Sequence, residues 1–366
     1  MKVLVTGSGG FIGKNLCWFL KQSGYEVLEF DRSNEDCLEK LVSEADFVMH
    51  LAGVNRPISN AEFYSGNRDL TERLVDALEA DHRYIPLLLS SSIQAEREND
   101  YGRSKKAAED LVFAYGKTGA SVFVFRLENA FGKWCRPNYN SVAATFCYNI
   151  AHDLPIQISD PEAQVSFVYI DDICKTFIQC IGRKGSSEIF HVNPVYPVRL
   201  KDLSGMLHSF RNSRENRYLP DLEEGFEKKL YSTYLSYLPE NQFAYPLESH
   251  ADARGSFTEF VKSPDRGQVS VNISKPGITK GNHWHHTKNE KFLVVKGEAV
   301  IRFRKVGTEK IYEYPVSGEK LMVVDIPTGY THSIENTGTE DLITIMWANE
   351  PFDPADPDTF FEEVLL

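Results

Sequence analysis

The chain has 366 residues, of which 42% are hydrophobic and 25% are charged, and its formal net charge at pH 7 is −12. A chain of this length is too long for one ordinary hydrophobic core, so two or three domains are expected. The acidic balance argues against nucleic acid or an anionic membrane surface as the main partner.

Composition also bears on cellular location. All six cysteines precede residue 181 and show no paired spacing, which favours reduced thiols over a disulfide framework. No run approaches the roughly 20 apolar residues that a membrane span needs. A predicted strand begins at residue 2, which leaves no room for a signal peptide. We therefore expect a cytoplasmic protein.

Strand and helix signals alternate in the first part of the chain. Residues 2–6 are short, apolar and followed by a glycine, as in a buried parallel strand. Residues 11–23 carry apolar side chains at helical spacing. This alternation implies an α/β Rossmann-type fold with a doubly wound parallel sheet. The later expected elements are strands 26–30, 46–51, 85–90 and 121–126, helices 61–80 and 101–116, and a terminal helix plus linker within 211–241.

The pattern changes after about Pro246. Short alternating segments separated by Gly and Pro predict strands, and no long helix intervenes. Such a pattern is typical of a small antiparallel barrel or jelly roll. We therefore predict an N-terminal domain over residues 1–245 and an all-β domain over 246–366. The expected strands are 268–273, 291–295, 299–304, 310–315, 320–326 and 342–347.

A glycine-rich turn joins the first strand to the first helix. Gly7, Gly10 and Gly13 permit a tight turn and a close backbone approach, so that a pyrophosphate can sit on the helix N-terminus beside Phe11 and Ile12. The pattern is weak alone, but its position between strand and helix favours a dinucleotide cofactor. We expect all five residues to bind it.

Asp31 and Arg32 end the second strand. An acidic residue at this position usually binds the ribose 2′-hydroxyl of NADH, whereas a neighbouring arginine accommodates the 2′-phosphate of NADPH. The alternative is a solvated arginine at a strand end. We expect both residues to contact the cofactor and NADPH to be preferred.

A serine run, Ser90 to Ser92, ends a later strand, and Tyr101 and Lys105 follow at the start of a helix. The two residues lie on one helix face. The Lys105 ammonium is expected to lower the pKa of the Tyr101 phenol, making it a workable acid or base. A serine hydroxyl nearby can hold a substrate carbonyl. An isolated pair at this spacing would more often belong to an ordinary surface helix.

Six motifs in chain order make residues 1–240 resemble the extended short-chain dehydrogenase/reductases that act on nucleotide sugars. They are TGSGGFIG at 6–13, HLAG at 50–53, SSS at 90–92, YGRSK at 101–105, RLENAFG at 126–132 and VYIDDI at 168–173. The resemblance implies a catalytic trio, a wall of the cofactor cleft and a residue that faces the substrate. These are Ser92, Tyr101 and Lys105, then His50, Leu51, Ala52 and Gly53, and finally Asn129.

The resemblance implies further roles for three residues, and the sequence departs from the family at one place. Lys105 is also expected to touch the nicotinamide ribose, and Asp171 and Asp172 are expected to be structural. The spacing from Ser92 to Tyr101 is shorter than in the family. The shorter spacing trims the loop over the active site. The substrate contacts made by this loop are therefore not predicted.

Four residues of the second domain have the spacing of a metal site. His283 and His285 alternate on a predicted strand, and Glu290 and His332 are expected from neighbouring strands. Three imidazoles and a carboxylate suit a divalent metal, with zinc as the first choice. The pattern resembles the cupins over about residues 247–366. A lone histidine pair would more often belong to a core or a surface.

The same domain also resembles the metal-free cupins that epimerise nucleotide 4-keto-6-deoxy sugars at C3 and C5. The shared residues include Arg254 and Glu259, which would bind substrate, and His283, which would be a base. Residues 342–349 lack the tyrosine that serves as acid in those enzymes. A metal that polarises the carbonyl could replace it. His283 is therefore either ligand or base, and we favour ligand.

The combination of both halves resembles a family of capsular polysaccharide enzymes. It implies a UDP-2-acetamido-2,6-dideoxy-hexos-4-ulose as substrate, epimerised at C3 by the cupin and reduced at C4 with NADPH. The product would be UDP-N-acetyl-6-deoxy-L-talosamine, a precursor of UDP-N-acetyl-L-fucosamine. The alternatives are a reductase whose cupin only dimerises or binds a ligand, and a non-enzymatic NADP sensor. We expect a homodimer with no nucleic acid or membrane partner.

Overall fold

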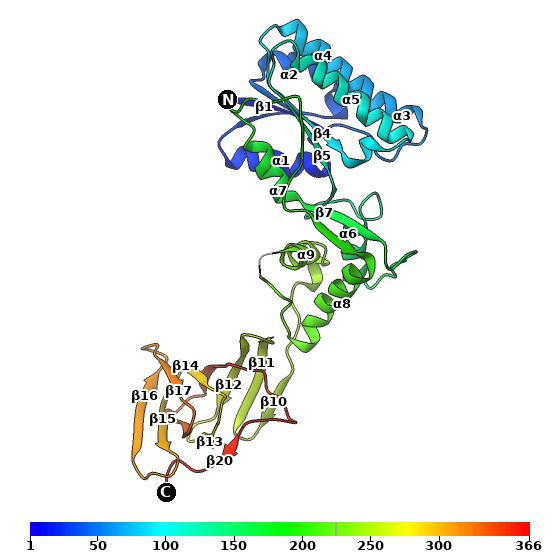
Figure 1. Ribbon diagram of the computed structural model, residues 1–366. Helices are drawn as coiled ribbons and strands as arrows, with labels where there is room; N and C mark the ends of the chain where they lie inside the picture. The colour runs from blue at the N-terminus through cyan, green and yellow to red at the C-terminus, as the bar shows by residue number, and fades with distance from the viewer. Residues whose placement is uncertain (224) are drawn as a thin grey trace. The chain divides into compact units, whose positions relative to one another are not determined.

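The computed structural model describes residues 1–223 and 225–366, which divide into two compact units (Figure 1). The N-terminal unit contains Met1–His208 and Glu223–Pro239, and the C-terminal unit contains Ser209–Leu222 and Glu240–Leu366. Residues 209–222 therefore belong with the β-rich unit although they precede residue 246. The domain boundary at 245/246 stays a prediction.

A six-stranded parallel sheet forms the centre of the N-terminal unit. The strand order is β2-β1-β3-β4-β5-β8, so the chain runs outward from β1 to β2 and then crosses back to β3. Ligands of such sheets bind beyond the carboxyl ends of the strands at this reversal. The predicted doubly wound fold is confirmed. The strands are β1 (Lys2–Thr6), β2 (Glu26–Phe30), β3 (Phe47–His50), β4 (Leu87–Ser92), β5 (Val122–Leu127) and β8 (Ile189–Phe190).

Helices cover both faces of this sheet because successive strand residues point to opposite faces. Val3 and Val5 of β1 pack in a core with residues of α1 (Phe11–Gln22) and α7 (Ile170–Ile178). Leu4 packs in a second core with residues of the three helices on the other face, as Figure 1 shows. Those helices are α2 (Leu38–Glu44), α4 (Leu70–Asp81) and α5 (Asp100–Gly116).

Some expected helices take a different form. The helix expected over 61–80 begins with α3 (Ala61–Phe63) and a π-helical turn, η2 (Tyr64–Asp69), before α4. The segment 211–241 contains two helices instead of one, namely the end of α8 (Leu200–Asn216) and α9 (Phe226–Leu235). The 3₁₀ turn η1 (Arg32–Cys37) and α2 were not predicted. Throughout the described ranges, no helix is long and apolar enough to cross a membrane.

The remaining elements of the N-terminal unit form a lobe beside the sheet (Figure 1). Its small sheet has the order β6-β7-β9. Asp171 and Asp172 form ion pairs with Lys133 at 2.5 Å and Lys229 at 2.6 Å, in keeping with the structural role expected for them. The elements are η3 (Ile93–Glu96), β6 (Asn129–Phe131), α6 (Val142–Ala151), β7 (Gln164–Tyr169) and β9 (Tyr196–Arg199).

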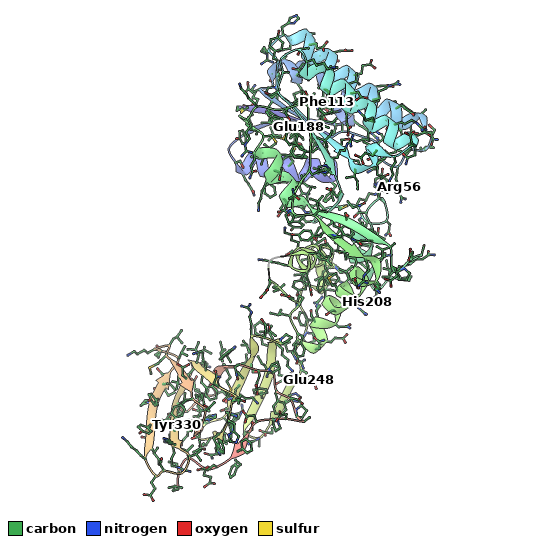
Figure 2. The ribbon with its side chains drawn as sticks, in the orientation of Figure 1. Arg56, Phe113, Glu188, His208, Glu248 and Tyr330 are labelled. Carbon is green, nitrogen blue, oxygen red and sulfur yellow. The ribbon has the colours of Figure 1, made fainter. Side chains whose placement is uncertain are left out.

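The C-terminal unit consists of two sheets packed face to face, as expected for an all-β domain. The sheet orders are β10-β11-β12-β19-β14-β17 and β16-β15-β18-β13-β20, with antiparallel pairing. Phe292, Ile301 and Ile334 lie in the core between them, and Tyr330 packs against this core (Figure 2).

The strands of the first sheet are β10 (Ser249–Asp252), β11 (Gly255–Ser263), β12 (Gly267–Ser274), β14 (Glu290–Lys296), β17 (Val323–Ile326) and β19 (Leu342–Ala348). Those of the second are β13 (Thr279–Trp284), β15 (Glu298–Lys305), β16 (Ile311–Ser317), β18 (Tyr330–Asn336) and β20 (Phe360–Phe361). A 3₁₀ turn, η4 (Glu240–Gln242), precedes them.

Candidate functional site

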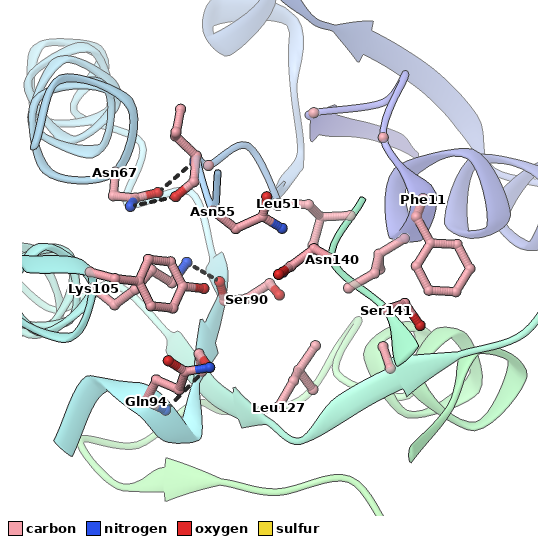
Figure 3. Close-up of a pocket in the computed structure, with 18 of the residues that line it drawn as sticks. Phe11, Leu51, Asn55, Asn67, Ser90, Gln94, Lys105, Leu127, Asn140 and Ser141 are labelled. Carbon is pink, nitrogen blue, oxygen red and sulfur yellow. Dashed lines mark hydrogen bonds between the residues drawn. The ribbon is translucent and has the colours of Figure 1, made fainter. Parts of the chain in front are cut away.

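A cavity of about 880 Å³ opens in the N-terminal unit at the carboxyl ends of β1, β3 and β4 (Figure 3). This is the place where the strand order reverses. Three predicted residues, His50, Asp31 and Arg32, do not line it, and neither does Ala52. The predicted residues that do line it are Gly7, Gly10, Phe11, Ile12, Gly13, Leu51, Gly53, Ser92, Tyr101, Lys105 and Asn129.

The glycine-rich turn has the geometry that a pyrophosphate needs. Gly7 has φ +69°, and a Cβ on Gly13 would lie 2.1 Å from the Gly7 carbonyl oxygen, so neither position accepts a side chain without distortion. Gly10 is the N-cap of α1 and supplies no capping side chain. The first N–H groups of α1 are therefore left for a ligand, and the helix dipole favours an anion there.

His50 and Ala52 support this turn from behind. The Thr6 hydroxyl accepts hydrogen bonds from the backbone N–H groups of Leu51 (3.1 Å) and Ala52 (3.2 Å). It also bonds to Nδ1 of His50 at 2.6 Å, and Nε2 of His50 bonds to the Thr71 hydroxyl at 2.9 Å. Burial, and next the charge of Lys105, lower the pKa of His50 to about 3. His50 is therefore a neutral structural residue.

Asp31 and Arg32 lie at the end of β2, beside the glycine-rich turn. Oδ1 of Asp31 accepts hydrogen bonds from the hydroxyl and backbone N–H of Ser33, which lower the pKa of Asp31. Its Oδ2 faces Gly9, where a Cβ would lie 3.1 Å away. Arg32 is exposed and forms no ion pair with the residues that the structure describes. Its preference for a 2′-phosphate stays a prediction.

The predicted catalytic trio comes together at the floor of the cavity. The short connection after Ser92 folds as the turn η3, and the Ser92 hydroxyl lies close enough to Tyr101 to influence its pKa. The Tyr101 ring packs on Phe63 at 5.4 Å. Nζ of Lys105 donates a hydrogen bond to the Ser90 carbonyl at 2.8 Å, as Figure 3 shows.

The electrostatics of this trio differ from the expectation in one respect. Burial raises the pKa of Tyr101, and only the hydrogen bond to Ser92 opposes that effect. The predicted lowering by Lys105 was wrong, because the ammonium is directed at the Ser90 carbonyl. Burial lowers the pKa of Lys105 to about 8, with Glu109 opposing the shift. Tyr101 is therefore a protonated phenol at neutral pH, which suits it to donate a proton.

Sequence reasoning missed a buried ion pair beneath this trio. Glu109 is fully buried and accepts hydrogen bonds from the Ser91 hydroxyl at 2.6 Å and from Nε of Arg126 at 2.9 Å. It follows Lys105 by four residues on α5, so the spacing of the helix face was the signal that could have identified it. Each serine of the run therefore has its own neighbour. The Ser90 carbonyl bonds to Lys105, the Ser91 hydroxyl bonds to Glu109, and the Ser92 hydroxyl lies beside Tyr101.

Sequence reasoning also missed the loop before α6. Its residues line the same cavity, and the Arg136 guanidinium lies over the Tyr139 ring at 5.1 Å. Loops lack a hydrophobic period, so their path cannot be predicted from spacing. Asn129 lines the same cavity, where its Nδ2 donates to the Ser166 carbonyl at 3.1 Å. The loop residues at the cavity are Trp134, Cys135, Arg136, Tyr139, Asn140 and Ser141.

The C-terminal unit contains the four expected metal ligands in one cluster. One ligand atom from each of His283, His285, Glu290 and His332 lies within 4.8 Å of the others. His283 of β13 is paired in register with His332 of β18. Glu290 opens β14 in the opposing sheet, and His285 lies just beyond the end of β13. The cluster therefore joins both sheets instead of lying on neighbouring strands of one.

The donor atoms of this cluster fit a divalent cation. Oε2 of Glu290 lies 3.2 Å from Nε2 of His332 and 3.5 Å from Nε2 of His285. Within the described ranges these atoms are buried without a hydrogen-bond partner, and so is Nδ1 of His332. Buried polar atoms are rarely left unpaired, because each costs about 1–3 kcal/mol. A cation at their centre would satisfy Oε2 of Glu290 and Nε2 of both histidines, although not Nδ1 of His332.

The protonation states agree with this interpretation. Burial alone would raise the pKa of Glu290, but His285 and His332 hold it well below its usual range. Burial, and next His332, lower the pKa of His283 to about 4. Burial also lowers the pKa of His285, but Glu290 and the Asp358 carbonyl reverse the shift. An ionised Glu290 and a neutral His283 are in the forms that bind metals, whereas the raised pKa of His285 means that metal would compete with a proton there.

A second cavity, of about 700 Å³, adjoins the cluster in the C-terminal unit. Arg254 lines it, with its guanidinium 2.7 Å from Asp252. Glu259, the other predicted substrate residue, does not line it. Its carboxylate is held by Arg217 at 3.1 Å and Lys262 at 2.8 Å, so Glu259 is a structural residue. Among the described lining residues there is no tyrosine.

Comparison with known proteins shows the family to which this chain belongs. Residues 3–192 match the NAD dependent epimerase/dehydratase family, and residues 250–360 match the polysaccharide biosynthesis C-terminal domain. The chain belongs to the NAD dependent epimerase/dehydratase family.

Particular relatives cover both units. A UDP-2-acetamido-2,6-beta-L-arabino-hexul-4-ose reductase of Pseudomonas aeruginosa is 48% identical over 364 residues, which is 98% of each chain. The crystal structure of the capsular polysaccharide assembling protein CapF of Staphylococcus aureus is 52% identical, with a TM-score of 0.93 over 100% of both chains. CapF with the inhibitor 3-isopropenyl-tropolone is 48% identical, with a TM-score of 0.89 over 100% of both chains. The predicted resemblance to capsular polysaccharide enzymes is confirmed.

Proposed function

We propose that this chain reduces the C4 ketone of a UDP-2-acetamido-2,6-dideoxy-hexos-4-ulose with NADPH, after its C-terminal unit has epimerised C3. The product would be UDP-N-acetyl-6-deoxy-L-talosamine, a precursor of UDP-N-acetyl-L-fucosamine. The observation that carries the proposal is that Ser92, Tyr101, Lys105 and the glycine-rich turn line one cavity. The name of the Pseudomonas aeruginosa relative supports this sugar as the substrate.

In the N-terminal unit, NADPH would supply the hydride that adds to C4. The pyrophosphate would be held by the N-terminus of α1, and Lys105 would reach the nicotinamide ribose. Ser92 and Tyr101 would hold the ketone oxygen by their hydroxyls. Tyr101 would then donate its proton to that oxygen, because its raised pKa keeps the phenol protonated. Asn129 would face the sugar from the cavity wall.

In the C-terminal unit, His283, His285, Glu290 and His332 would hold a divalent metal, with zinc as the first choice. When bound, the metal would polarise the C4 ketone and so acidify the C3 proton. Arg254 would attract the UDP phosphates at the second cavity. His283 could act either as a metal ligand or as the base, and we favour the ligand role.

A second copy of this chain is the expected partner. Val323, Leu293, Ile345 and Val271 are consecutive neighbours across four strands. Val323 is 56% exposed and Ile345 37% exposed, whereas Val324 on the other face of β17 is buried. An apolar outer face of this kind favours a protein interface. Analytical ultracentrifugation should find a homodimer, and a monomer at all concentrations would contradict it.

The runner-up is a reductase whose C-terminal unit only dimerises or binds a ligand, since the name of the Pseudomonas aeruginosa relative mentions reduction alone. Incubation with the 4-keto sugar in heavy water, with and without NADPH, separates the two. The bifunctional proposal expects solvent deuterium at C3 in both arms and an alcohol only with NADPH. An alcohol without deuterium at C3 would leave the runner-up.

A further inference from the structure

We propose that Asp358 is a positioning residue for the metal centre, which it serves by fixing both the ring of His285 and the turn at residues 286–288. The proposal rests on the metal-binding role given above to the cluster. Asp358 follows His285 by 73 positions and belongs to a segment that no sequence motif singled out.

The carboxylate of Asp358 organises the turn between two ligands. Oδ1 accepts a hydrogen bond from the backbone N–H of His286 at 2.9 Å. Oδ2 accepts from the N–H groups of Thr287 and Lys288, each at 2.8 Å, and from the Thr287 hydroxyl at 3.0 Å. These residues directly follow His285 and precede Glu290. One side chain therefore sets the path of the chain from one ligand to the next.

The backbone carbonyl of Asp358 orients the first ligand. Nδ1–H of His285 donates to this oxygen at 2.5 Å. In the neutral ring this leaves Nε2 as the unprotonated nitrogen, and Nε2 lies 3.5 Å from Oε2 of Glu290. Hydrogen bonds of this type fix the tautomer and the ring orientation of histidine ligands. His285 is 2% exposed, so water cannot easily take over the role.

The surrounding segment is paired with β13, the strand that contains His283. Phe360 and Phe361 of β20 pair with Trp284 and His283 of β13. The Trp284 and Phe360 rings stack at 5.0 Å. Nζ of Lys288 donates to the Pro357 carbonyl at 2.7 Å. These contacts hold Asp358 in place on both sides.

The backbone of Asp358 limits which substitutions are informative. Its φ is +40°, in the left-handed region that glycine, asparagine and aspartate tolerate best. An alanine would add strain unrelated to the hydrogen bonds. Asp358→Asn keeps the shape but places an NH₂ group against backbone donors. Asp358→Gly keeps the φ angle and removes the carboxylate. Asp356→Asn, an exposed change two residues away, is the matched control.

The test measures zinc affinity of the full chain by competition with a coloured chelator. Asp358→Asn and Asp358→Gly should weaken zinc binding by about 10- to 100-fold, the usual effect of losing a partner behind a ligand. Asp356→Asn should bind like the wild type. The NADPH affinity of every variant should be unchanged, which shows that the N-terminal unit is folded, and an unchanged urea unfolding curve of the metal-free chain shows the same for the C-terminal unit. Wild-type zinc affinity in both Asp358 variants would overturn the positioning role. A wild-type chain that binds no zinc would instead overturn the metal centre on which the role rests.

Discussion

The side chain of Lys105 is a buried ammonium. The amount by which its charge lowers the free energy of unfolding depends on pH. Burial lowers its pKa to about 8 from an ordinary value of 10.5. Between these two values the unfolded chain binds the proton more strongly than the folded chain does. The stability that the buried charge removes is therefore regained as pH rises from about 8 to 10.5.

Lys105→Met should abolish that part of the pH dependence. Between pH 8 and 10.5, the free energy of unfolding of the cofactor-free wild type should rise relative to the variant, by up to about 1.4 kcal/mol per pH unit. Urea unfolding at several pH values measures it. Parallel curves for the two proteins would mean that Lys105 keeps an ordinary pKa.

Tyr101→Phe should remove reduction without removing epimerisation. The phenol is the proton donor in the proposed reduction, and loss of a general acid usually costs about 100- to 10,000-fold in rate. Exchange of the C3 proton should persist, because the metal ligands belong to the other compact unit. NADPH oxidation and deuterium incorporation measure the two activities. Loss of both in a folded variant would contradict the division of labour.

Arg32→Ala should weaken the preference for NADPH. A charge-assisted hydrogen bond to the 2′-phosphate is worth about 1.5–3 kcal/mol, so the KM for NADPH should rise about 10- to 100-fold. The KM for NADH should change little, because Asp31 remains to bind a 2′-hydroxyl. An unchanged ratio of the two constants would remove Arg32 from the cofactor site.

At the scale of elements, Glu109 ties α5 to two strands of the central sheet. It bonds to Ser91 of β4 and to Arg126 of β5. Glu109→Gln leaves the Arg126 guanidinium with only the exposed Glu96 as counter-charge, and breaking a buried ion pair typically costs about 3–5 kcal/mol. Asp110→Asn, which removes only an exposed pair with Lys106, should cost less than about 1 kcal/mol. Thermal unfolding compares the two, and equal losses would refute a special role for the buried pair.

The elements that sequence reasoning located are those with a clear hydrophobic period. Strands β1 to β5 and helices α1 and α5 were predicted to within a few residues, and α4 at its end only, since each has apolar side chains on a buried face. Strand β18 was missed because Thr331, His332, Ser333 and Asn336 are buried polar residues. Without apolar side chains on its buried face, this strand has no hydrophobic period to detect.

Some residues of the candidate site could be located from motif spacing, and others could not. Motif spacing located the glycine-rich turn, the trio and the four ligands. It misplaced Glu259, which has the right position in the strand pattern but bonds to Arg217 and Lys262. It gave no signal for Asp358, because a partner 73 residues away in sequence is brought to His285 only by the fold.

At the scale of the whole molecule, the two proposed reactions require one order. The C3 proton is acidic only while C4 is a ketone, so epimerisation must precede reduction. Removing the metal with a chelator, or changing His285 to Ala, should stop C3 exchange and yield little alcohol or the unepimerised one. Adding zinc back to the chelated wild type should restore exchange. Exchange that survives in metal-free protein would return His283 to the role of base.

The chain passes between its two units three times, after residues 208, 222 and 239. In the first excursion, Arg217 and Leu219 exchange backbone hydrogen bonds of 2.8 Å with Lys262 at the end of β11, beyond the stretch that β10 covers. A gene fragment starting at residue 246 would therefore encode a barrel with part of one sheet edge missing. A single recombination event could not swap either unit whole. The two units of this chain are therefore interleaved in sequence, and no single cut point separates them.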